Sequence, residues 1–133
     1  MVKTIDKSYK RTKYHLIIMG RAYSPHSHSS ARYKDKVRGE ASKVINKAIE
    51  GNLSIRTDYF YTDSKNRLDG DNLLKIICDG LKSVAYYDDS QVTEHHAYIY
   101  NLNRSFTIQE APFPEIFDYL GRGDFVAVTV SSI

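Results

Sequence analysis

The sequence predicts a single α+β domain, a mixed α/β arrangement in which two main helices pack on a mixed sheet of about four to five strands. Short β-branched and aromatic runs alternate with two longer segments of helical periodicity. The chain has 133 residues, enough to bury one hydrophobic core without disulfide or metal support. The order of strand, helix, strand, helix and further strands is typical of helices layered on one sheet.

The first half of the chain is predicted to hold a basic arm, two strands and one helix. Residues 1–13 are polar and basic, and we expect a flexible arm. Residues 14–19 (YHLIIM) predict a buried strand, and residues 20–30 predict a loop that contains Gly, Pro and four serines. Residues 53–61 alternate as a strand does. Between loop and strand, a helix over 31–50 is predicted from an apolar stripe with helical spacing: Tyr33, Val37, Ala41, Val44 and Ala48.

The second half is organised around residues 69–92. A helix there is predicted from Leu73, Ile77, Leu81 and Val84, which recur at three- and four-residue steps. Residues 91–100 predict a strand, residues 104–109 a further one, residues 115–120 a short helix and residues 125–130 a final apolar strand. In the strand over 91–100 we expect Val92, Glu94, His96, Tyr98 and Tyr100 on one side.

Composition indicates an ordinary globular protein of a reducing compartment. Apolar residues make up 41% of the chain and charged residues 26%, so global disorder is not expected. The single cysteine, Cys78, excludes an internal disulfide framework. We find no signal segment and no apolar run of membrane-spanning length, so a cytoplasmic location without membrane contact is expected.

The net charge of +3 hides an uneven distribution. Residues 1–50 hold twelve Lys and Arg against four Asp and Glu, whereas residues 51–133 hold seven against twelve. A basic half suits a polyanion and an acidic half suits cations, although two solvated faces would give the same pattern. The basic residues that we expect to contact DNA phosphates are Lys10, Arg11, Lys13, Arg21, Arg32, Lys34 and Lys36.

The acidic residues of 69–92 raise the question of a metal site. Asp69 and Asp71 precede the predicted helix, and Asp88 and Asp89 follow it. Such acids repel one another unless they are solvated, protonated or bridged by a cation. Hard divalent ions such as Mg²⁺ or Mn²⁺ bind a few carboxylates and keep room for substrate phosphates. Lys75, one helical turn beyond Asp71, can neutralise a phosphate, or simply pair with a neighbouring acid.

Other motifs do not fit these residues. No EF-hand loop begins at Asp63, Asp69 or Asp71, and the chain has no phosphate-binding Walker loop, no zinc-type Cys/His spacing and no G-x-S-x-G turn. Metal-assisted phosphodiester hydrolysis needs clustered acids, a nearby Lys and a basic flank. A capping role for Asp71 and a solvated acidic surface remain the alternative from the residues alone.

The whole stretch resembles the signature of the RusA family of Holliday junction resolvases. The matching residues are Asp69-x-Asp71-Asn72-Leu73-Leu74-Lys75, then Asp79-x-Leu81, then Asp88-Asp89-Ser90-Gln91-Val92. The resemblance departs at Gly70, where an apolar residue is usual, and does not extend beyond about residue 101. It implies a homodimeric, Mg²⁺-dependent endonuclease that cuts four-way DNA junctions in recombination and repair. Carried over by position, Asp69, Asp71 and Asp89 would be the metal-binding catalytic acids and Lys75 the essential basic residue.

Three alternatives stay open at this point. The chain could be a nuclease of broader branched-DNA specificity, or a module that binds DNA structures without cutting them. An interaction protein with no nucleic-acid role is the third class. These alternatives differ in whether a labelled junction is cut, is bound only, or is ignored.

Overall fold

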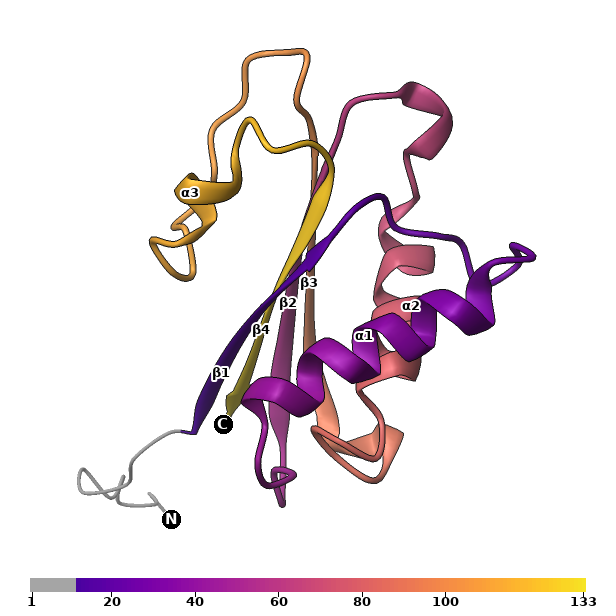
Figure 1. The fold of residues 1–133 in the computed structure, drawn as a ribbon. Coiled ribbons are helices and arrows are strands. Elements are labelled where there is room, and N and C mark those ends of the chain that lie inside the picture. Colours follow the sequence, from indigo (N-terminus) through magenta and orange to yellow (C-terminus); the bar gives the residue numbers. More distant parts are fainter. Residues whose placement is uncertain (1–11) are drawn as a thin grey trace.

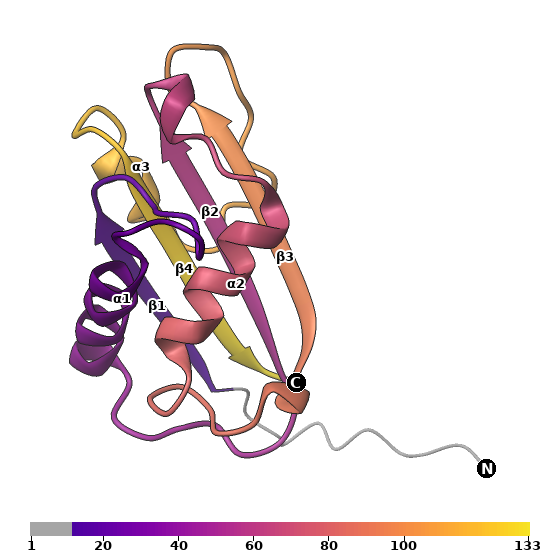
Figure 2. The ribbon, with the colours of Figure 1, turned by 90° about the vertical axis from the view of Figure 1, so that its right-hand side faces the viewer.

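The computed structural model describes residues 12–133, which form one four-stranded mixed sheet between two layers of other structure (Figure 1). Helices α1 and α2 cover one face of the sheet, and the short α3 lies on the other (Figure 2). This confirms the predicted α+β class, with four strands among the described residues. The elements in chain order are β1 (Lys13–Met19), α1 (Ser30–Val44), β2 (Leu53–Tyr61), η1 (Ser64–Asn66), α2 (Gly70–Leu81), η2 (Asp89–Gln91), β3 (Val92–Asn101), α3 (Ile116–Tyr119) and β4 (Phe125–Ser132).

The direction of the strands decides where the functional segments lie. The strand order is β1-β4-β2-β3, with β4 antiparallel to β1 and β2, and β2 parallel to β3. Strands β1, β2 and β3 therefore run the same way. Because α1 follows β1 and α2 follows β2, both helices begin near the same edge of the sheet. The segment between α2 and β3 lies near the opposite edge.

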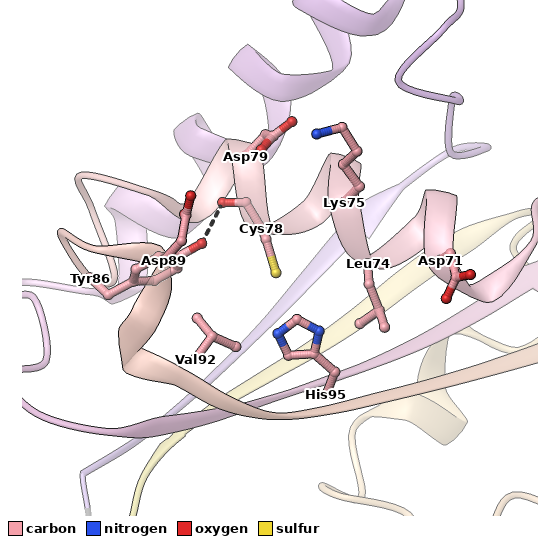
Figure 3. Close-up of a pocket in the computed structure, with 9 residues that line it drawn as sticks. All are labelled: Asp71, Leu74, Lys75, Cys78, Asp79, Tyr86, Asp89, Val92 and His95. Carbon is pink, nitrogen blue, oxygen red and sulfur yellow. Dashed lines mark hydrogen bonds between the residues drawn. The ribbon is translucent and has the colours of Figure 1, made fainter.

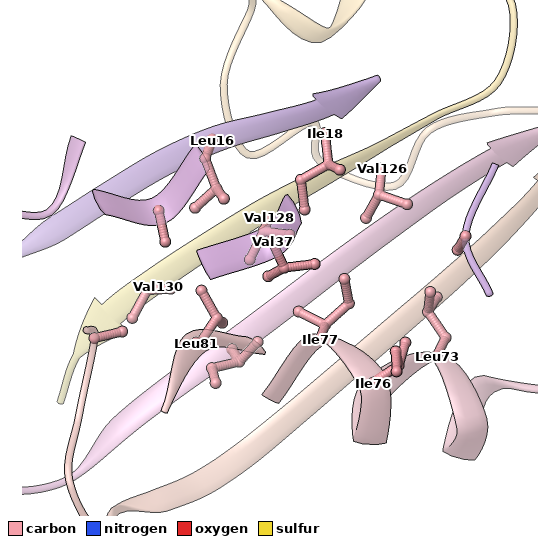
Figure 4. Packing of buried hydrophobic residues seen from close by; sticks show 14 of the residues in the cluster. Leu16, Ile18, Val37, Leu73, Ile76, Ile77, Leu81, Val126, Val128 and Val130 are labelled. Atoms are coloured by element: carbon pink, nitrogen blue, oxygen red, sulfur yellow. The ribbon is translucent and has the colours of Figure 1, made fainter. Parts of the chain in front are cut away.

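The main core lies between the sheet and the two helices (Figure 4). Helix α2 presents Leu73, Ile76, Ile77 and Leu81, all fully buried, to strands whose β-branched side chains fill the layer below. The two helices approach closely at Gly80, where an added Cβ would lie 2.6 Å from the Val37 Cβ. Only glycine allows this approach without a shift of α1.

The C-terminal segment builds a second, aromatic core on the other face of the sheet. Its buried members are Phe60, Tyr100, Phe113, Ile116, Phe125 and Ala127. Both faces of the later part of β2 are consequently buried, and Asp58 is enclosed there at 0% exposure. The Arg56 guanidinium pairs with Asp58 through three hydrogen bonds: Nε donates to both carboxylate oxygens, at 3.0 and 3.3 Å, and Nη2 donates to one of them at 3.2 Å.

Several predicted boundaries were wrong for identifiable reasons. Helix α1 ends at Val44 rather than residue 50, because the extended backbone at Ile45 turns Ile45 and Ile49 into the core in place of Val44, which is 43% exposed. Residues 104–109 form no strand; bends and turns lead the chain to the second core instead. The predicted arm, residues 1–13, falls outside the described residues except for Thr12 and Lys13, and Lys13 already pairs with Ser131 in the sheet. Among residues 12–133, no helix combines the length and apolar character that crossing a membrane requires.

Candidate active site

Helix α2 begins between the two acids predicted to bind metal. Asp69 is the N-cap residue, a position that the sequence interpretation gave to Asp71. The Asp69 carbonyl accepts a hydrogen bond from the Leu73 N–H at 3.0 Å, but its carboxylate makes no capping bond. That carboxylate is 79% exposed and lies 3.3 Å from Arg67 Nη1. Asp71 is an exposed residue of the first turn, where the helix dipole favours negative charge. Neither carboxylate is occupied in capping the helix.

Lys75 lies one turn further along α2, on the exposed side of the helix. The alternative that Lys75 simply pairs with a neighbouring acid was wrong. Within residues 12–133 no ion pair joins Lys75 to Asp71 or Asp79; Asp79 instead offers its backbone carbonyl to Arg38 Nη2 at 3.1 Å. The Lys75 ammonium thus remains available to a ligand in the cavity beside it.

The two acids after α2 differ in their roles. Asp88 caps η2: its carboxylate accepts a hydrogen bond from the Ser90 N–H at 2.9 Å, and that bond holds the Asp88 pKa below its usual value. The Gln91 side chain completes a capping box by accepting the Asp88 N–H. Asp89 has no such function. Its carboxylate is 78% exposed and lies 3.4 Å from Lys82 Nζ.

A cavity of about 250 Å³ runs along α2 and collects most of these groups (Figure 3). In the figure Asp71 lies toward one end and Asp89 toward the other, with Leu74 and His95 between them. Asp69 does not line it. The lining residues are Asp71, Leu74, Lys75, Cys78, Asp79, Tyr86, Asp89, Val92 and His95. Three carboxylates and one ammonium around a shared space can bind a cation and a phosphate together.

The predicted metal ligands are only partly brought together. Among the described residues, no group of three or more His, Cys, Asp and Glu side chains surrounds one point. Asp69 and Asp71 flank the start of α2, and two exposed carboxylates fit a hard divalent ion that keeps several waters. Asp89 lies at the far end of a helix about 18 Å long. The donor set therefore fits a cation at Asp69 and Asp71, without Asp89 from the same chain.

His95 is a cavity residue that the sequence interpretation missed. Strict alternation puts Val92 and His95 on opposite sides of β3, yet both line the cavity. The pairing of β2 with β3 explains this: Leu53 pairs with Val92 but Ser54 pairs with Glu94, so Thr93 is an extra residue in a β-bulge. A bulge changes which face the following side chains occupy. No feature of the sequence predicts this bulge.

Of the five predicted DNA-contacting residues that the structure describes, three lie around one cavity and two lie apart from it. Arg21 follows β1, and Arg32 and Lys36 lie in the first turns of α1; these three line a second cavity. Lys34 lies on the α2 side of α1, where its carbonyl would be 3.1 Å from a Cβ at position 80. Lys13 is exposed at the start of β1. Lys10 and Arg11 lie outside the described residues.

The geometry of acids, lysine and basic cavity agrees with what comparison with known families finds. The family model described as endodeoxyribonuclease RusA matches residues 6–109, which is most of the chain. No individual curated protein gave a significant match. The family match spans every element that lines the cavity and stops before α3 and β4. The chain belongs to the RusA family of endodeoxyribonucleases.

Proposed function

We propose that this protein is a Mg²⁺-dependent endonuclease that resolves four-way DNA junctions by paired cuts, in the cytoplasm, during recombination and repair. The observation that carries the proposal is the cavity along α2, where Asp71, Lys75 and Asp89 share one space in a chain of a nuclease family. Mn²⁺, which accepts the same hard oxygen ligands, would serve in place of Mg²⁺.

Each residue of the site has a proposed role. Asp69, Asp71 and Asp89 hold the cation, which when bound polarises the scissile phosphate and lowers the pKa of a coordinated water. Lys75 places its ammonium beside the phosphate that enters the cavity. Hydrolysis adds negative charge to that phosphate, and a fixed cation in a partly enclosed site stabilises the added charge more than water does.

A homodimer would supply what one chain lacks. Asp69 and Asp71 lie at one end of α2 and Asp89 at the other, and within residues 12–133 no three such side chains surround one point. A two-fold axis across the exposed side of α2 reverses the helix in the second copy, bringing the partner subunit's Asp89 toward Asp71. Such a dimer has two sites, and a junction requires cuts in two strands.

The basic residues supply sequence-independent affinity for DNA. Lys and Arg side chains neutralise backbone phosphates and release counterions, so the affinity should fall steeply with salt. The proposed contacts are Lys10, Arg11, Lys13, Arg21, Arg32, Lys34 and Lys36.

The decisive experiment compares labelled four-way junction, fork, duplex and single strand, each with Mg²⁺, Mn²⁺ or EDTA. Symmetric paired nicks on the junction alone, lost in EDTA, support the proposal. Cuts on forks and flaps as well would indicate a nuclease of broader branched-DNA specificity. Binding without cuts in any metal would indicate a DNA-structure-binding module. An Asp71→Asn variant should bind the junction and leave it uncut, whereas Asp35→Asn, an exposed acid on α1, should cut normally.

A further inference from the structure

A second cavity, separate from the acidic one, lies where β1 leads into α1. Its volume is about 270 Å³. The residues around it are Gly20, Arg21, Tyr23, Ser29, Arg32, Tyr33 and Lys36. Three of these carry a positive charge and none carries a negative one. Three cations around one small cavity repel one another, and an anion bound there would offset that repulsion.

Two of the three basic side chains of this cavity, those of Arg21 and Lys36, are held in place by neighbouring groups. The Arg21 guanidinium lies 4.0 Å from the centre of the Tyr23 ring, a cation–π contact. The Tyr23 ring in turn packs against Tyr33, with ring centres 5.9 Å apart. Lys36 donates a hydrogen bond from its ammonium to the Met19 carbonyl. Arg32 is exposed and has no ion-pair partner among residues 12–133.

The start of α1 offers hydrogen-bond donors to a ligand in the cavity. Tyr33 lines the cavity but is only 3% exposed, and its hydroxyl is buried without a hydrogen-bond partner in the described part of the chain. The N-cap residue of α1, Ser29, makes no side-chain capping bond, so N–H groups of the first helical turn stay available at the cavity.

Glycine at position 20 keeps the cavity open. Gly20 has a φ of +95°, a conformation that side chains with a Cβ rarely adopt. A Cβ there would also lie 3.2 Å from Lys36 Nζ. A side chain at position 20 would therefore both strain the turn and crowd the ammonium that faces the cavity.

We propose that this cavity binds one phosphate group of DNA, held by Arg21, Arg32 and Lys36 and by donors at the start of α1. The identity of the phosphate carrier rests on the proposed function as a DNA nuclease. The cavity lies at the sheet edge where α1 and α2 both begin, which is also the edge of Asp69 and Asp71. A phosphate bound at this one place would position the DNA strand that reaches the acids. Basic residues spread evenly over a surface would attract DNA without fixing the position of that strand.

The first test measures junction binding by fluorescence anisotropy in EDTA over a range of salt concentrations. Arg32→Ala should weaken binding about tenfold, as loss of a charged hydrogen bond does. It should also reduce the slope of log K against log[salt] by about 0.9, the value for one phosphate contact. The matched control is Lys47→Ala, an exposed lysine beyond the other end of α1, which should change affinity less than about twofold. Equal losses in both variants, or none in either, would overturn the proposal.

A second test does not depend on nuclease activity. Inorganic phosphate is titrated into the full chain, and backbone amide shifts are followed by NMR. We expect saturable shifts around Ser29 and Arg32 in the wild type and in Asp71→Asn, and weaker binding in Arg32→Ala. Phosphate affinity unchanged in Arg32→Ala would contradict the site even if DNA is cut.

The phosphate can come from two places in DNA, and the junction itself distinguishes them. Junctions are prepared with 5′-phosphate or 5′-hydroxyl ends, and the Arg32→Ala loss is measured on each. An equal loss of affinity on both junctions would show that the cavity binds an internal phosphodiester. A loss confined to the 5′-phosphorylated junction assigns it to a strand end. Phosphate binding in the NMR titration combined with no Arg32→Ala effect on either junction would refute DNA as the carrier.

Discussion

Asp71 and Asp89 line the same cavity but lie toward opposite ends of it, with Leu74 and His95 between them (Figure 3). The topology requires this separation. Asp71 follows the end of β2 and Asp89 precedes the start of β3, and those two strands are parallel. A Mg²⁺ ion holds its ligand oxygens at about 2.1 Å, and among the described residues no three His, Cys, Asp or Glu side chains are grouped closely enough to hold one ion.

Mixed dimers test whether the site is shared between two copies. Asp71→Asn and Asp89→Asn should each abolish junction cutting alone. When the two variants are mixed and allowed to exchange subunits, nicking should return, because each mixed dimer contains one site with both acids intact. The measurement is nicking of a labelled junction before and after mixing.

The matched control mixes Asp69→Asn with Asp71→Asn. These two acids flank the same end of α2, so neither site of a mixed dimer would have both, and cutting should stay absent. No recovery from the Asp71 and Asp89 pair would place those two ligands within one chain. Recovery in the control would place Asp69 and Asp71 of one site in different chains. Either result would contradict the proposed shared site.

Lys75 should act on the chemical step rather than on binding. Lys75→Met removes an ammonium beside the cavity while keeping the apolar stem. Loss of one such stabilising group lowers rates by about 100-fold or more. Single-turnover nicking should fall by that factor while junction affinity changes less than about threefold. Lys65→Met, at an exposed lysine of η1, should leave both unchanged. An equal fall in affinity for Lys75→Met would mean that the lysine serves DNA binding only.

Substitution by alanine should change stability in opposite directions at Gly80 and Gly39, because the two helical glycines have different surroundings. At Gly80 a Cβ would meet Val37 at 2.6 Å, so Gly80→Ala should lower the free energy of unfolding by about 1–3 kcal/mol through overpacking. At Gly39, on α1, nothing lies within 4 Å of an added Cβ. Gly39→Ala should raise stability by about 0.5–1 kcal/mol through helix propensity. Urea unfolding of both variants measures this, and a neutral Gly80→Ala would show that α1 moves away freely.

The strands were predictable because their patterns depend on local sequence. The run 53–61 became β2 with its predicted bounds, since β-branched and aromatic residues end there at polar turns. What depended on tertiary packing was not predictable. The early end of α1 follows from how Ile45 and Ile49 reach the core, and the facing of His95 follows from a bulge formed by pairing with β2.

The candidate site was likewise predictable from the sequence only in part. The acids and Lys75 could be chosen from their spacing around α2, since a helix fixes its own geometry. Their separation into Asp69 and Asp71 at one end and Asp89 at the other depends on strand order, which the spacing does not contain. Arg21 and Lys36 line the basic cavity from the two sides of a loop. They come together only through the fold, so their proximity could not be predicted from the sequence.

Arg56 should control how stability depends on pH. Asp58 is fully buried, and desolvation raises its pKa, while hydrogen bonds from Arg56 oppose that rise. With the folded pKa above the unfolded value, the folded state binds more protons in this range, and stability falls as pH rises through it. Arg56→Met removes the opposing effect, so the folded pKa of Asp58 rises further. The loss of stability should thus be smallest near pH 3, where only the bonds of Arg56 to backbone carbonyls are missed, and should grow to about 3–5 kcal/mol at pH 7.

The measurement is urea unfolding of the wild type and Arg56→Met from pH 3 to pH 8. Arg104→Met, at an exposed arginine, controls for loss of positive charge and should lie within about 0.5 kcal/mol of the wild type at every pH. Arg56 also donates to the carbonyls of Gln109 and Glu110, so part of its loss is independent of Asp58. The double variant Arg56→Met/Asp58→Asn separates the pH-dependent part of the loss from the pH-independent part. It still lacks the bonds from Arg56 to the two carbonyls, but it has no carboxyl group to titrate at position 58. Its loss in free energy of unfolding should therefore be constant with pH. A loss in free energy of unfolding that still grows with pH in the double variant would show that a group other than Asp58 causes the pH dependence.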